Sequence, residues 1–231
     1  MDSKLFVIIP AFNEEASIGL VIDDIPVEVA EVVVVSNGST DDTVATATKH
    51  GATVIDESRK GYGWACLAGM HHLGSKAIAK DIIVFLDGDY SDYPEQMLAL
   101  TSPIQNDEYD LVIGARRKEL REKGSMTFPQ IFGNWLSTTL MRWLFGSKFT
   151  DLGPFRAIRY DKLMALEMED KTYGWTVEMQ LKALKRHYRY MEVAVPYRNR
   201  IGVSKVSGTV KGAIFAGVKI LSWIFKYGFK K

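Results

Sequence analysis

Cysteine is almost missing from this chain of 231 residues, since Cys66 is the only one. One cysteine excludes an internal disulfide and a metal site made of clustered cysteines, and it is compatible with a reducing compartment. Histidine is scarce too, with four residues in all. The adjacent pair His71-His72 has no partner at the spacing of a metal site, so histidine gives no competing metal centre.

Long uninterrupted hydrophobic runs are also missing. The first apolar run, residues 5–9, is too short for the core of a signal peptide, and we therefore expect a cytoplasmic protein. Two longer apolar segments, 131–145 and 210–227, are interrupted by polar residues and lack the roughly 20 consecutive apolar residues that a spanning helix needs. Each is compatible with a helix in the membrane interface, with the lysines of the second segment toward lipid phosphates, or with an ordinary helix packed on a sheet.

The net charge is close to zero, +1 from 29 basic and 28 acidic residues, but the charge is unevenly distributed. Residues 185–231 contain eleven Lys and Arg against one acid, Glu192, which gives +10, so the first 184 residues carry 18 − 27 = −9. A basic C-terminal end favours an anionic partner, although a solvated lysine-rich tail is the alternative. Nucleic acid is disfavoured as that partner, because the basic residues are interleaved with Ile, Val and Gly rather than arranged as a stacking groove.

The first half of the chain alternates two kinds of segment. Short segments that are apolar throughout are typical of strands buried on both faces, and they occupy 5–10, 32–35, 52–55, 82–86 and 111–113. Segments with helical spacing lie at 14–25, 40–50 and 63–80. This alternation predicts an α/β fold in which helices flank a mostly parallel sheet, in a single domain over residues 1–231. The charged segment 116–129 is expected to be a mobile loop.

Such sheets bind ligands beyond the carboxyl ends of their strands. The segments that follow the predicted strands therefore meet on one rim of the sheet. They are 10–15, 36–42, 87–92 and 114–117.

Two carboxylates on this rim, Asp87 and Asp89, directly follow a buried strand. Gly88 between them lets the backbone approach a ligand closely. Carboxylates together with phosphate oxygens are the ligands that Mg²⁺ or Mn²⁺ prefers. An Asp-x-Asp pair is also common in turns, and the loops at 9–15 and 37–42 are each compatible with helix caps. Three such loops after three strands favour a metal and phosphate site over three separate caps.

Eight short motifs occur in order along nearly the whole chain. They are residues 9–15 (IPAFNEE), 37–42 (NGSTDD), 59–63 (RKGYG), 87–89 (DGD), 114–116 (GAR), 151–156 (DLGPFR), 174–179 (GWTVEM) and 198–205 (RNRIGVSK). As a set they resemble the family 2 glycosyltransferases, which have the Rossmann-like GT-A fold. Within that family the chain is most similar to the dolichyl- or polyprenyl-phosphate mannose and glucose synthases.

The resemblance implies an inverting, metal-dependent glycosyltransferase that moves a hexose, glucose or mannose, from a UDP- or GDP-linked donor to a polyprenyl or dolichyl phosphate. Mg²⁺ or Mn²⁺ is the implied cofactor. Residues 1–117 would bind the nucleotide sugar, and 118–231, with the C-terminal amphipathic helices, would bind the acceptor. We expect peripheral contact with the cytoplasmic face of the membrane. The oligomeric state is left open, and a homo-oligomer is one of the alternatives. The alternatives are a cytosolic transferase with a soluble hydroxyl acceptor and a non-catalytic nucleotide-sugar-binding module.

The resemblance also assigns residues to sites. The nucleotide-sugar site would comprise Pro10, Ala11, Asn13, Glu14, Asn37, Asp41, Lys60, Gly61, Asp87, Gly88 and Asp89, of which Asp87 and Asp89 would bind the metal. The acceptor site would comprise Arg116, Arg117, Asp151, Gly153, Arg200, Ser204 and Lys205. The implied catalytic residues are Asp89, Glu178, Arg116 and Arg200, where arginine supplies fixed charge to anionic oxygens. For the C-terminal cations, plain surface charge is the alternative.

Some positions depart from the family pattern. Ser36 stands where many relatives carry Asp, and Ser91 stands where the polyprenyl-phosphate synthases often have Gln beside the metal, a place that Asp92 could fill. An acceptor phosphate is already ionised at neutral pH and needs no strong base. An acceptor hydroxyl would need one, for which Glu178 is the best candidate. Its alternative role is to hold the acceptor loop at the start of a helix.

Overall fold

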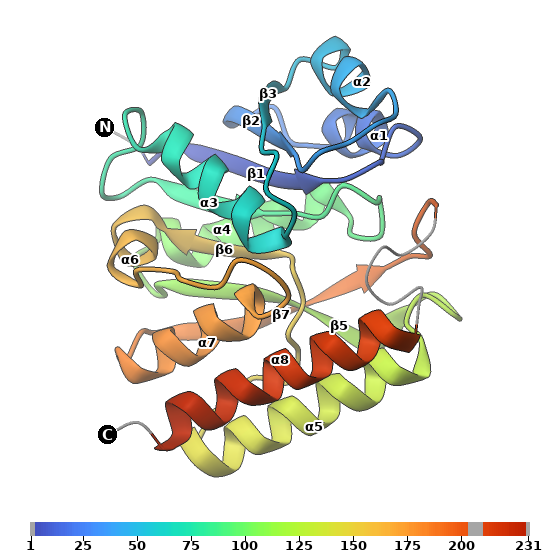
Figure 1. The fold of residues 1–231 in the computed structure, drawn as a ribbon. Helices are drawn as coiled ribbons and strands as arrows, with labels where there is room; N and C mark the ends of the chain where they lie inside the picture. Colours follow the sequence, from blue (N-terminus) through green and yellow to red (C-terminus); the bar gives the residue numbers. More distant parts are fainter. Residues whose placement is uncertain (1–2, 203–209, 230–231) are drawn as a thin grey trace.

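The computed structural model describes residues 3–202 and 210–229. The predicted acceptor residues Ser204 and Lys205 lie outside the described residues. Figure 1 shows a central sheet with helices on both of its faces, and the pair α5 and α8 beside one edge of that body. The predicted single α/β domain with a mostly parallel sheet is confirmed.

The sheet has seven strands in the order β3-β2-β1-β4-β6-β5-β7. β6 is antiparallel to both of its neighbours, whereas the other pairs are parallel. Two antiparallel pairings in succession restore the direction, so β5 and β7 run the same way as β1, β2, β3 and β4. The carboxyl ends of these six strands therefore meet on one rim. The strands are β1 (Leu5–Ala11), β2 (Val29–Ser36), β3 (Thr53–Asp56), β4 (Ile82–Phe85), β5 (Leu111–Arg121), β6 (Arg156–Arg159) and β7 (Tyr190–Tyr197).

Apolar side chains on the two faces of the strands form two cores. One core lies under α1, α2 and α4, and the other lies under α3, α6 and α7 and extends to α5 and α8. In the second core, Phe85 of β4 meets Trp175 of α7 edge to face, with ring centroids 6.0 Å apart. The helices are α1 (Ile18–Asp23), α2 (Thr43–Lys49), α3 (Tyr62–Leu73), α4 (Met97–Gln105) after the 3-10 turn η1 (Pro94–Gln96), α5 (Phe128–Phe145), α6 (Tyr160–Ala165), α7 (Trp175–Lys185) and α8 (Val210–Phe229).

The segment 116–129, predicted to be a mobile loop, is largely regular structure. β5 continues to Arg121, because its outer part pairs with β7 at Arg116↔Val195 and Arg121↔Tyr197. α5 begins at Phe128, earlier than predicted, because Thr127 and Gln130 form a capping box at its start. The predicted loop is therefore confined to the turn between β5 and α5.

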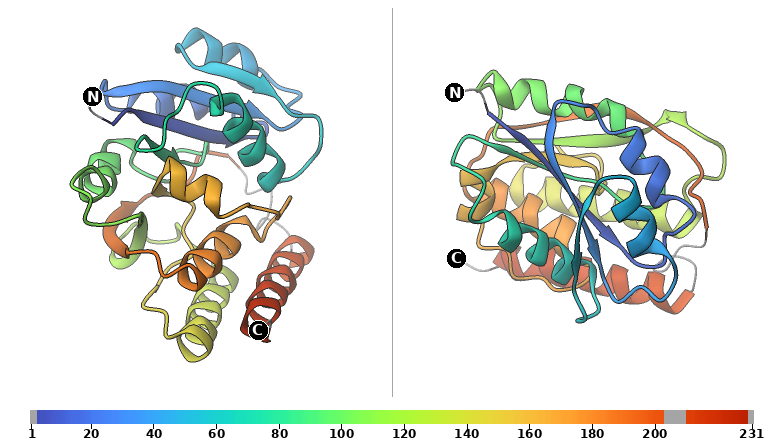
Figure 2. Two further views of the ribbon diagram at one scale, coloured as in Figure 1. Left: turned by 90° about the vertical axis from the view of Figure 1, so that its left-hand side faces the viewer. Right: turned by 90° about the horizontal axis from the view of Figure 1, so that it is seen from above.

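α5 and α8 lie side by side in both figures of the fold (Figure 1 and Figure 2). α8 buries Trp223 and Ile224 against the second core, yet both helices expose large apolar side chains elsewhere. Among the described residues, no helix is long and apolar enough to cross a membrane. The exposed set is Phe128, Ile131, Phe132, Trp135, Trp143 and Leu144 on α5 and Phe215, Val218, Phe225 and Phe229 on α8.

Two lysines of α8, for which the sequence left contact with lipid phosphates open, are paired with acids of the described residues. Lys219 Nζ lies 3.1 Å from Asp170 Oδ2, and Lys226 Nζ lies 3.6 Å from Glu169 Oε2. The loop before α7 brings its acids against this helix, so these two lysines take part in the packing that the sequence left as the alternative to a membrane interface.

Candidate active site

The loops that follow β1, β2, β4 and β7 surround a cavity of about 380 Å³ at the rim of the sheet. It collects predicted residues that lie as far apart in the sequence as Pro10 and Arg200. Because the strand ends meet on one rim, residues of the predicted donor site and two predicted catalytic arginines share this cavity. The predicted residues that line it are Pro10, Ala11, Glu14, Asn37, Lys60, Gly61, Asp87, Gly88, Asp89, Arg116 and Arg200.

Asp87 and Asp89 sit at the end of β4 in different environments. Among the described residues, Asp87 Oδ1 has no hydrogen-bond partner, and burial, reinforced by the charge of Asp89, raises the pKa of Asp87 to about 7. Asp89 Oδ1 instead accepts hydrogen bonds from the backbone N–H of Ser91 at 2.9 Å and from its hydroxyl at 2.5 Å. Ser91 therefore orients Asp89.

Arg200 connects the two halves of the cavity. Its Nη2 lies 2.8 Å from Asp89 Oδ2 and 3.5 Å from Glu14 Oε1. A cation between the loops after β1 and β4 offsets the negative charge gathered there. In the described part of the chain, no group of three or more His, Cys, Asp or Glu side chains is arranged to hold a metal ion. A cation held here would thus need ligands from a bound molecule as well.

Asp92, which the sequence left as a possible further ligand of the metal, lies outside the cavity lining. Its side chain is buried. Neither of its carboxyl oxygens has a hydrogen-bond partner within residues 3–202 and 210–229. Burial, together with the charge of Asp87, raises its pKa well above the usual range, which favours the neutral form.

Asn13 and Asp41, predicted to line the nucleoside pocket, instead join the loops that form its wall. Asn13, whose φ is 54°, accepts a hydrogen bond on Oδ1 from the backbone N–H of Thr40 at 2.8 Å. Asp41 accepts from the backbone N–H of Glu15 at 3.2 Å and from the hydroxyl of Thr43 at 2.5 Å. These bonds hold the loop after β1 against the loop after β2, and neither side chain is part of the cavity lining.

Asn37 lines the cavity but uses its amide to shape the neighbouring loop. Its Nδ2 donates to the carbonyl of Arg59 at 2.8 Å, and its Oδ1 accepts from the backbone N–H of Gly61 at 2.7 Å. Gly61 has a φ of 143°, and a Cβ there would collide with the carbonyl of Lys171. Asn37 and Gly61 thus fix the position of Lys60 at the mouth of the cavity.

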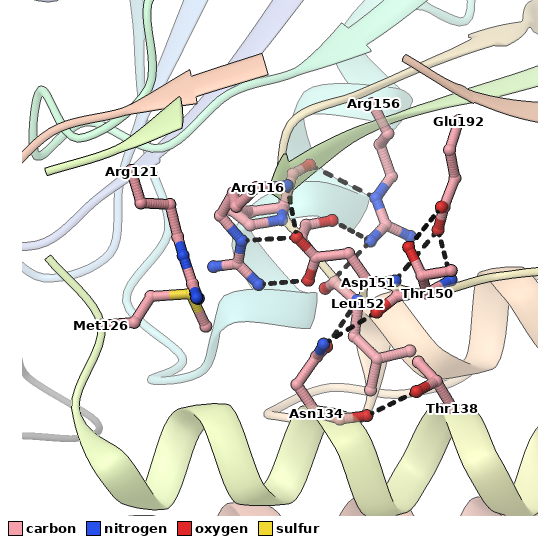
Figure 3. Close-up of polar contacts among 12 residues, drawn as sticks. Arg116, Arg121, Met126, Asn134, Thr138, Thr150, Asp151, Leu152, Arg156 and Glu192 are labelled. Atoms are coloured by element: carbon pink, nitrogen blue, oxygen red, sulfur yellow. Dashed lines mark hydrogen bonds and ion pairs between the residues drawn. The ribbon is translucent and has the colours of Figure 1, made fainter. Parts of the chain in front are cut away.

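Arg116 is held by Asp151, as Figure 3 shows. Asp151 Oδ2 accepts from the Arg116 backbone N–H and from its Nε, both at 2.8 Å, and Oδ1 accepts from Nη2 at 2.6 Å. Burial acts to raise the pKa of Asp151, but the Arg116 charge and hydrogen bonds outweigh it and lower that pKa. This forked pair fixes both the direction and the charge of the guanidinium.

The loop that carries Asp151 is itself held by side chains from three elements (Figure 3). Glu192 of β7 accepts from the backbone N–H groups of Thr150 at 2.6 Å and Asp151 at 3.0 Å. Asn134 of α5 donates to the carbonyl of Thr150 at 2.9 Å. Arg156 is buried and donates to backbone carbonyls of the loop, including that of Gly153. Gly153, predicted to bind the acceptor, is therefore a buried part of this support.

Glu178 does not reach the cavity, so its prediction as a general base is corrected. It is completely buried at the first turn of α7. Its carboxylate accepts from the backbone N–H groups of Glu169 and Asp170, each at 2.8 Å, and lies 2.8 Å from Lys182 Nζ. Its contacts instead fit the alternative role that the sequence left open, in which Glu178 holds the loop before this helix.

The comparison with known proteins decides the family. A family model described as "Glycosyl transferase family 2" matches residues 6–166. This chain belongs to glycosyl transferase family 2. An uncharacterized glycosyltransferase of Mycobacterium tuberculosis is 33% identical over 215 residues, which are 91% of this chain and 93% of the relative.

Two further relatives carry more informative names. The dolichyl-phosphate hexose transferase of Haloferax volcanii is 35% identical over 90% of this chain and 89% of its own length. The undecaprenyl-phosphate mannosyltransferase of Micrococcus luteus is 30% identical over 95% of this chain and 93% of its own length. Glucosyl-3-phosphoglycerate synthase of M. tuberculosis, crystallised with Mn²⁺, UDP-glucose and phosphoglyceric acid, has a TM-score of 0.78 at 23% identity, over 98% of this chain and 80% of that chain. That similarity confirms the predicted GT-A fold.

Several side chains that line the cavity of this family 2 chain were not predicted from the sequence. Phe12 and Tyr62 lie inside motifs that were recognised, and Lys60 Nζ lies 5.7 Å from the centroid of the Phe12 ring. Tyr173 and Tyr197 each stand directly before a recognised motif. Their position in or beside these motifs could have identified them, because ligand sites are commonly lined by aromatic side chains.

A second cavity, of about 290 Å³, lies on the other side of Arg116, between the outer part of β5 and α5. Arg117, predicted to bind the acceptor, lines it and pairs with Glu192 at 3.6 Å. Arg116 and Asp151 line it too, so the two cavities meet at the Arg116–Asp151 pair. The other basic residues around it are Lys118, Arg121 and Arg142.

Proposed function

We propose that this chain is an inverting, metal-dependent hexosyltransferase that moves glucose or mannose from a UDP- or GDP-linked donor to a polyprenyl or dolichyl phosphate. The observation that carries the proposal is one cavity that joins Asp87 and Asp89 to the oriented cation Arg116. Residues 1–117 supply most of the donor side, and residues 118–231 complete the acceptor side.

The residues at the end of β4 suit a divalent cation. The unpaired Asp87 Oδ1 and the neighbouring Asp89 carboxylate are hard oxygen ligands, and the diphosphate of a donor would supply further oxygens. Asp87 and Asp89 would hold Mg²⁺ or Mn²⁺. Bound there, the ion would neutralise charge that develops on the departing nucleoside diphosphate. The M. tuberculosis synthase crystallised with Mn²⁺ and UDP-glucose supports this choice of ion.

The cations of the chain orient the two phosphate groups. Arg200, 2.8 Å from Asp89, is placed to contact the donor diphosphate. Arg116, held by Asp151, is placed to contact an acceptor phosphate that enters from the other side. An acceptor oxygen attacks the anomeric carbon opposite the leaving diphosphate, the bond to that diphosphate breaks, and a single displacement inverts the configuration.

The contacts of Glu178 favour a phosphate acceptor over a hydroxyl. A hydroxyl has to lose its proton to a base, whereas a phosphate is ionised at neutral pH. Glu178, the best candidate base in the sequence, is occupied by two backbone N–H groups and Lys182. The names of the H. volcanii and M. luteus relatives agree with a lipid phosphate. The exposed apolar side chains of α5 and α8 support peripheral contact with a membrane, and we place that contact at its cytoplasmic face.

A second candidate function keeps the donor and replaces the lipid by a soluble phosphorylated acceptor. The cavity beside Arg117, with Lys118, Arg121 and Arg142, favours it, because a small polyanion would meet several cations there. The M. tuberculosis synthase, crystallised with phosphoglyceric acid, has the same fold.

Partitioning of a labelled hexose tests the two candidates. The protein is incubated with Mn²⁺, labelled UDP-glucose or GDP-mannose, and undecaprenyl phosphate, and the mixture is extracted with butanol. We expect label in the lipid phase with wild-type protein and none with Asp89→Asn. Label that stays in the aqueous phase with every lipid phosphate, but moves to phosphoglyceric acid, would support the second candidate.

A further inference from the structure

A third cavity, of about 270 Å³, leads from the active site toward α5 and α8. It shares Tyr62, Asp87 and Arg116 with the donor cavity, so the two are continuous at the reacting end. Its remaining wall is mainly apolar. We call it the helix groove, and its wall comprises Met126, Pro129, Gln130, Gly133, Asn134, Leu152, Pro154, Thr172, Tyr173, Trp175, Thr176, Ala216, Gly217 and Ile220.

Two glycines keep the helix groove open. Gly133 on α5 and Gly217 on α8 both line it, and a Cβ built on either would have no heavy atom of the described residues within 4 Å apart from its chain neighbours and its own helix backbone. At the other end of the pair the helices touch, since a Cβ on Gly228 would meet Leu144 Cδ1 at 3.1 Å. The space beside the two glycines is thus available to a ligand.

The inner end of the helix groove is polar. Arg116 lies there with its guanidinium oriented by Asp151. Trp175, only 1% exposed, also lines the groove and adds an aromatic side chain to its wall. The groove is therefore cationic at one end and apolar along its length.

Next to the groove-lining residues Pro129, Gly133 and Ala216 in the sequence, α5 and α8 expose large apolar side chains. Phe128 and Phe132 of α5 and Phe215 of α8 are each about half exposed or more. A ligand that leaves the groove here would pass from an apolar wall onto an apolar surface. That sequence of environments matches an amphiphile with a phosphate at one end and a long hydrocarbon chain at the other.

We propose that the helix groove binds the hydrocarbon chain of an isoprenoid phosphate, with the phosphate at Arg116 and the chain passing between Gly133 and Gly217. The inference rests on the proposed function for the identity of the acceptor, and it adds the path of the chain. The absence of a large side chain at these two positions then lets a chain fit.

Replacing the glycines by leucine tests this path. Gly133→Leu and Gly217→Leu extend a side chain into the groove from positions where a Cβ meets no described atom within 4 Å, and leucine favours a helix more than glycine does. Gly217→Ala adds a single methyl group at the same position. Ser222→Leu places the same leucine side chain on the exposed face of α8, outside the groove lining, and is the matched control.

Binding of farnesyl phosphate is measured by calorimetry, and hexose transfer to undecaprenyl phosphate is measured with labelled donor. We expect both leucine variants to weaken binding and transfer at least tenfold, with Gly217→Ala and Ser222→Leu within a factor of three of wild type. Thermal stabilisation by the donor with Mn²⁺ should be unchanged in all four, which shows that the variants are folded.

The outcomes separate the groove from the proposed function. If wild type binds farnesyl phosphate and the leucine variants do not, but no hexose reaches a lipid phosphate, the groove stands and the proposed function fails. If wild type transfers hexose to lipid and the leucine variants bind and transfer equally well, the path is wrong and the function stands. If wild type does not bind farnesyl phosphate, the groove is overturned.

Discussion

Arg200 Nη2 lies 2.8 Å from Asp89 Oδ2, which ties a residue that follows β7 to a carboxylate that follows β4. The contact exists because β4 and β7 end on the same rim, although 111 positions separate the two residues in the sequence (200 − 89). It brings a fixed cation to the place where the diphosphate of a donor would lie. The predictions that follow depend on this arrangement of charge.

The carboxylate of Asp89 should be essential, and Ser91 should matter less. Even residues that only orient a metal ligand change affinity or activity by about 10- to 100-fold, so we expect Asp89→Asn to lower kcat by more than about 100-fold and Ser91→Ala by about 10-fold. Steady-state transfer assays at saturating Mn²⁺ measure both. Equal activity of Asp89→Asn and wild type would show that the ion is not held here.

Asp151 should act through Arg116. Removing its charge in Asp151→Asn leaves the guanidinium without its forked partner, so we expect KM for the acceptor to rise at least tenfold while donor affinity stays the same. Arg116→Lys should show the same pattern, because lysine lacks the fork. Arg189→Gln, at the opposite end of β7, is the control for loss of one arginine. A change in donor affinity alone would contradict this division of roles.

Glu178 should contribute to stability and not to proton transfer. Glu178→Gln leaves Lys182 with no buried carboxylate beside it, and disrupting a buried ion pair costs about 3–5 kcal/mol, so the free energy of unfolding should fall by that order. Urea unfolding measures the loss. The folded fraction should keep its kcat, whereas a general base would lose about 10²- to 10⁴-fold.

Acid should destabilise the fold through Glu31 of β2. Burial acts to raise the pKa of Glu31, but hydrogen bonds from Lys76, His72 and Thr53 outweigh it and lower this pKa from 4.5 to about 2. Because the folded-state pKa is depressed, the stabilisation is present above pH 4.5 and is lost as the pH falls from 4.5 to 2. The free energy of unfolding of wild type should therefore fall between pH 4.5 and pH 2 more steeply than that of Glu31→Gln. The same dependence on pH in both proteins would contradict this role of Glu31.

A donor screen by thermal shift should identify the base. A ligand that binds only the folded protein at 100 times its Kd adds about 2.7 kcal/mol of stability. We expect one of UDP-glucose and GDP-mannose to raise the Tm in the presence of Mn²⁺, and chelation of the ion to remove most of that shift. A donor that stabilises the protein equally with and without the metal would not be held through Asp87 and Asp89.

The rim itself could be predicted from the sequence. Strands that are apolar throughout indicate a parallel sheet, and parallel strands bring their carboxyl ends together. That reasoning places Pro10, Asn37, Asp87 and Arg116 close together, as the cavity shows. Arg200 could be placed there only through the resemblance to family 2, since the antiparallel β6 that restores the direction of β5 and β7 has no signature of its own in the sequence.

The roles of individual residues around the rim could not be predicted from the sequence. Asn13 and Asp41 have the right residue types for a ligand site, yet their hydrogen-bonding capacity is used between loops that are distant in the sequence. Glu178 is buried because the loop at Glu169 folds back over α7. The length of β5 depends on its pairing with β7. Each of these outcomes is set by tertiary contacts, which override local patterns.

The linkage of the product tests the central claim most directly. Protein, Mn²⁺, the donor selected by thermal shift and undecaprenyl phosphate are incubated, and the product is examined by ³¹P NMR and by the one-bond carbon–hydrogen coupling at its anomeric carbon. The account predicts a hexose joined to the lipid through a phosphodiester in the β configuration, inverted from the α-linked donor. An α-linked product, or a hexose attached to a hydroxyl group, would contradict it.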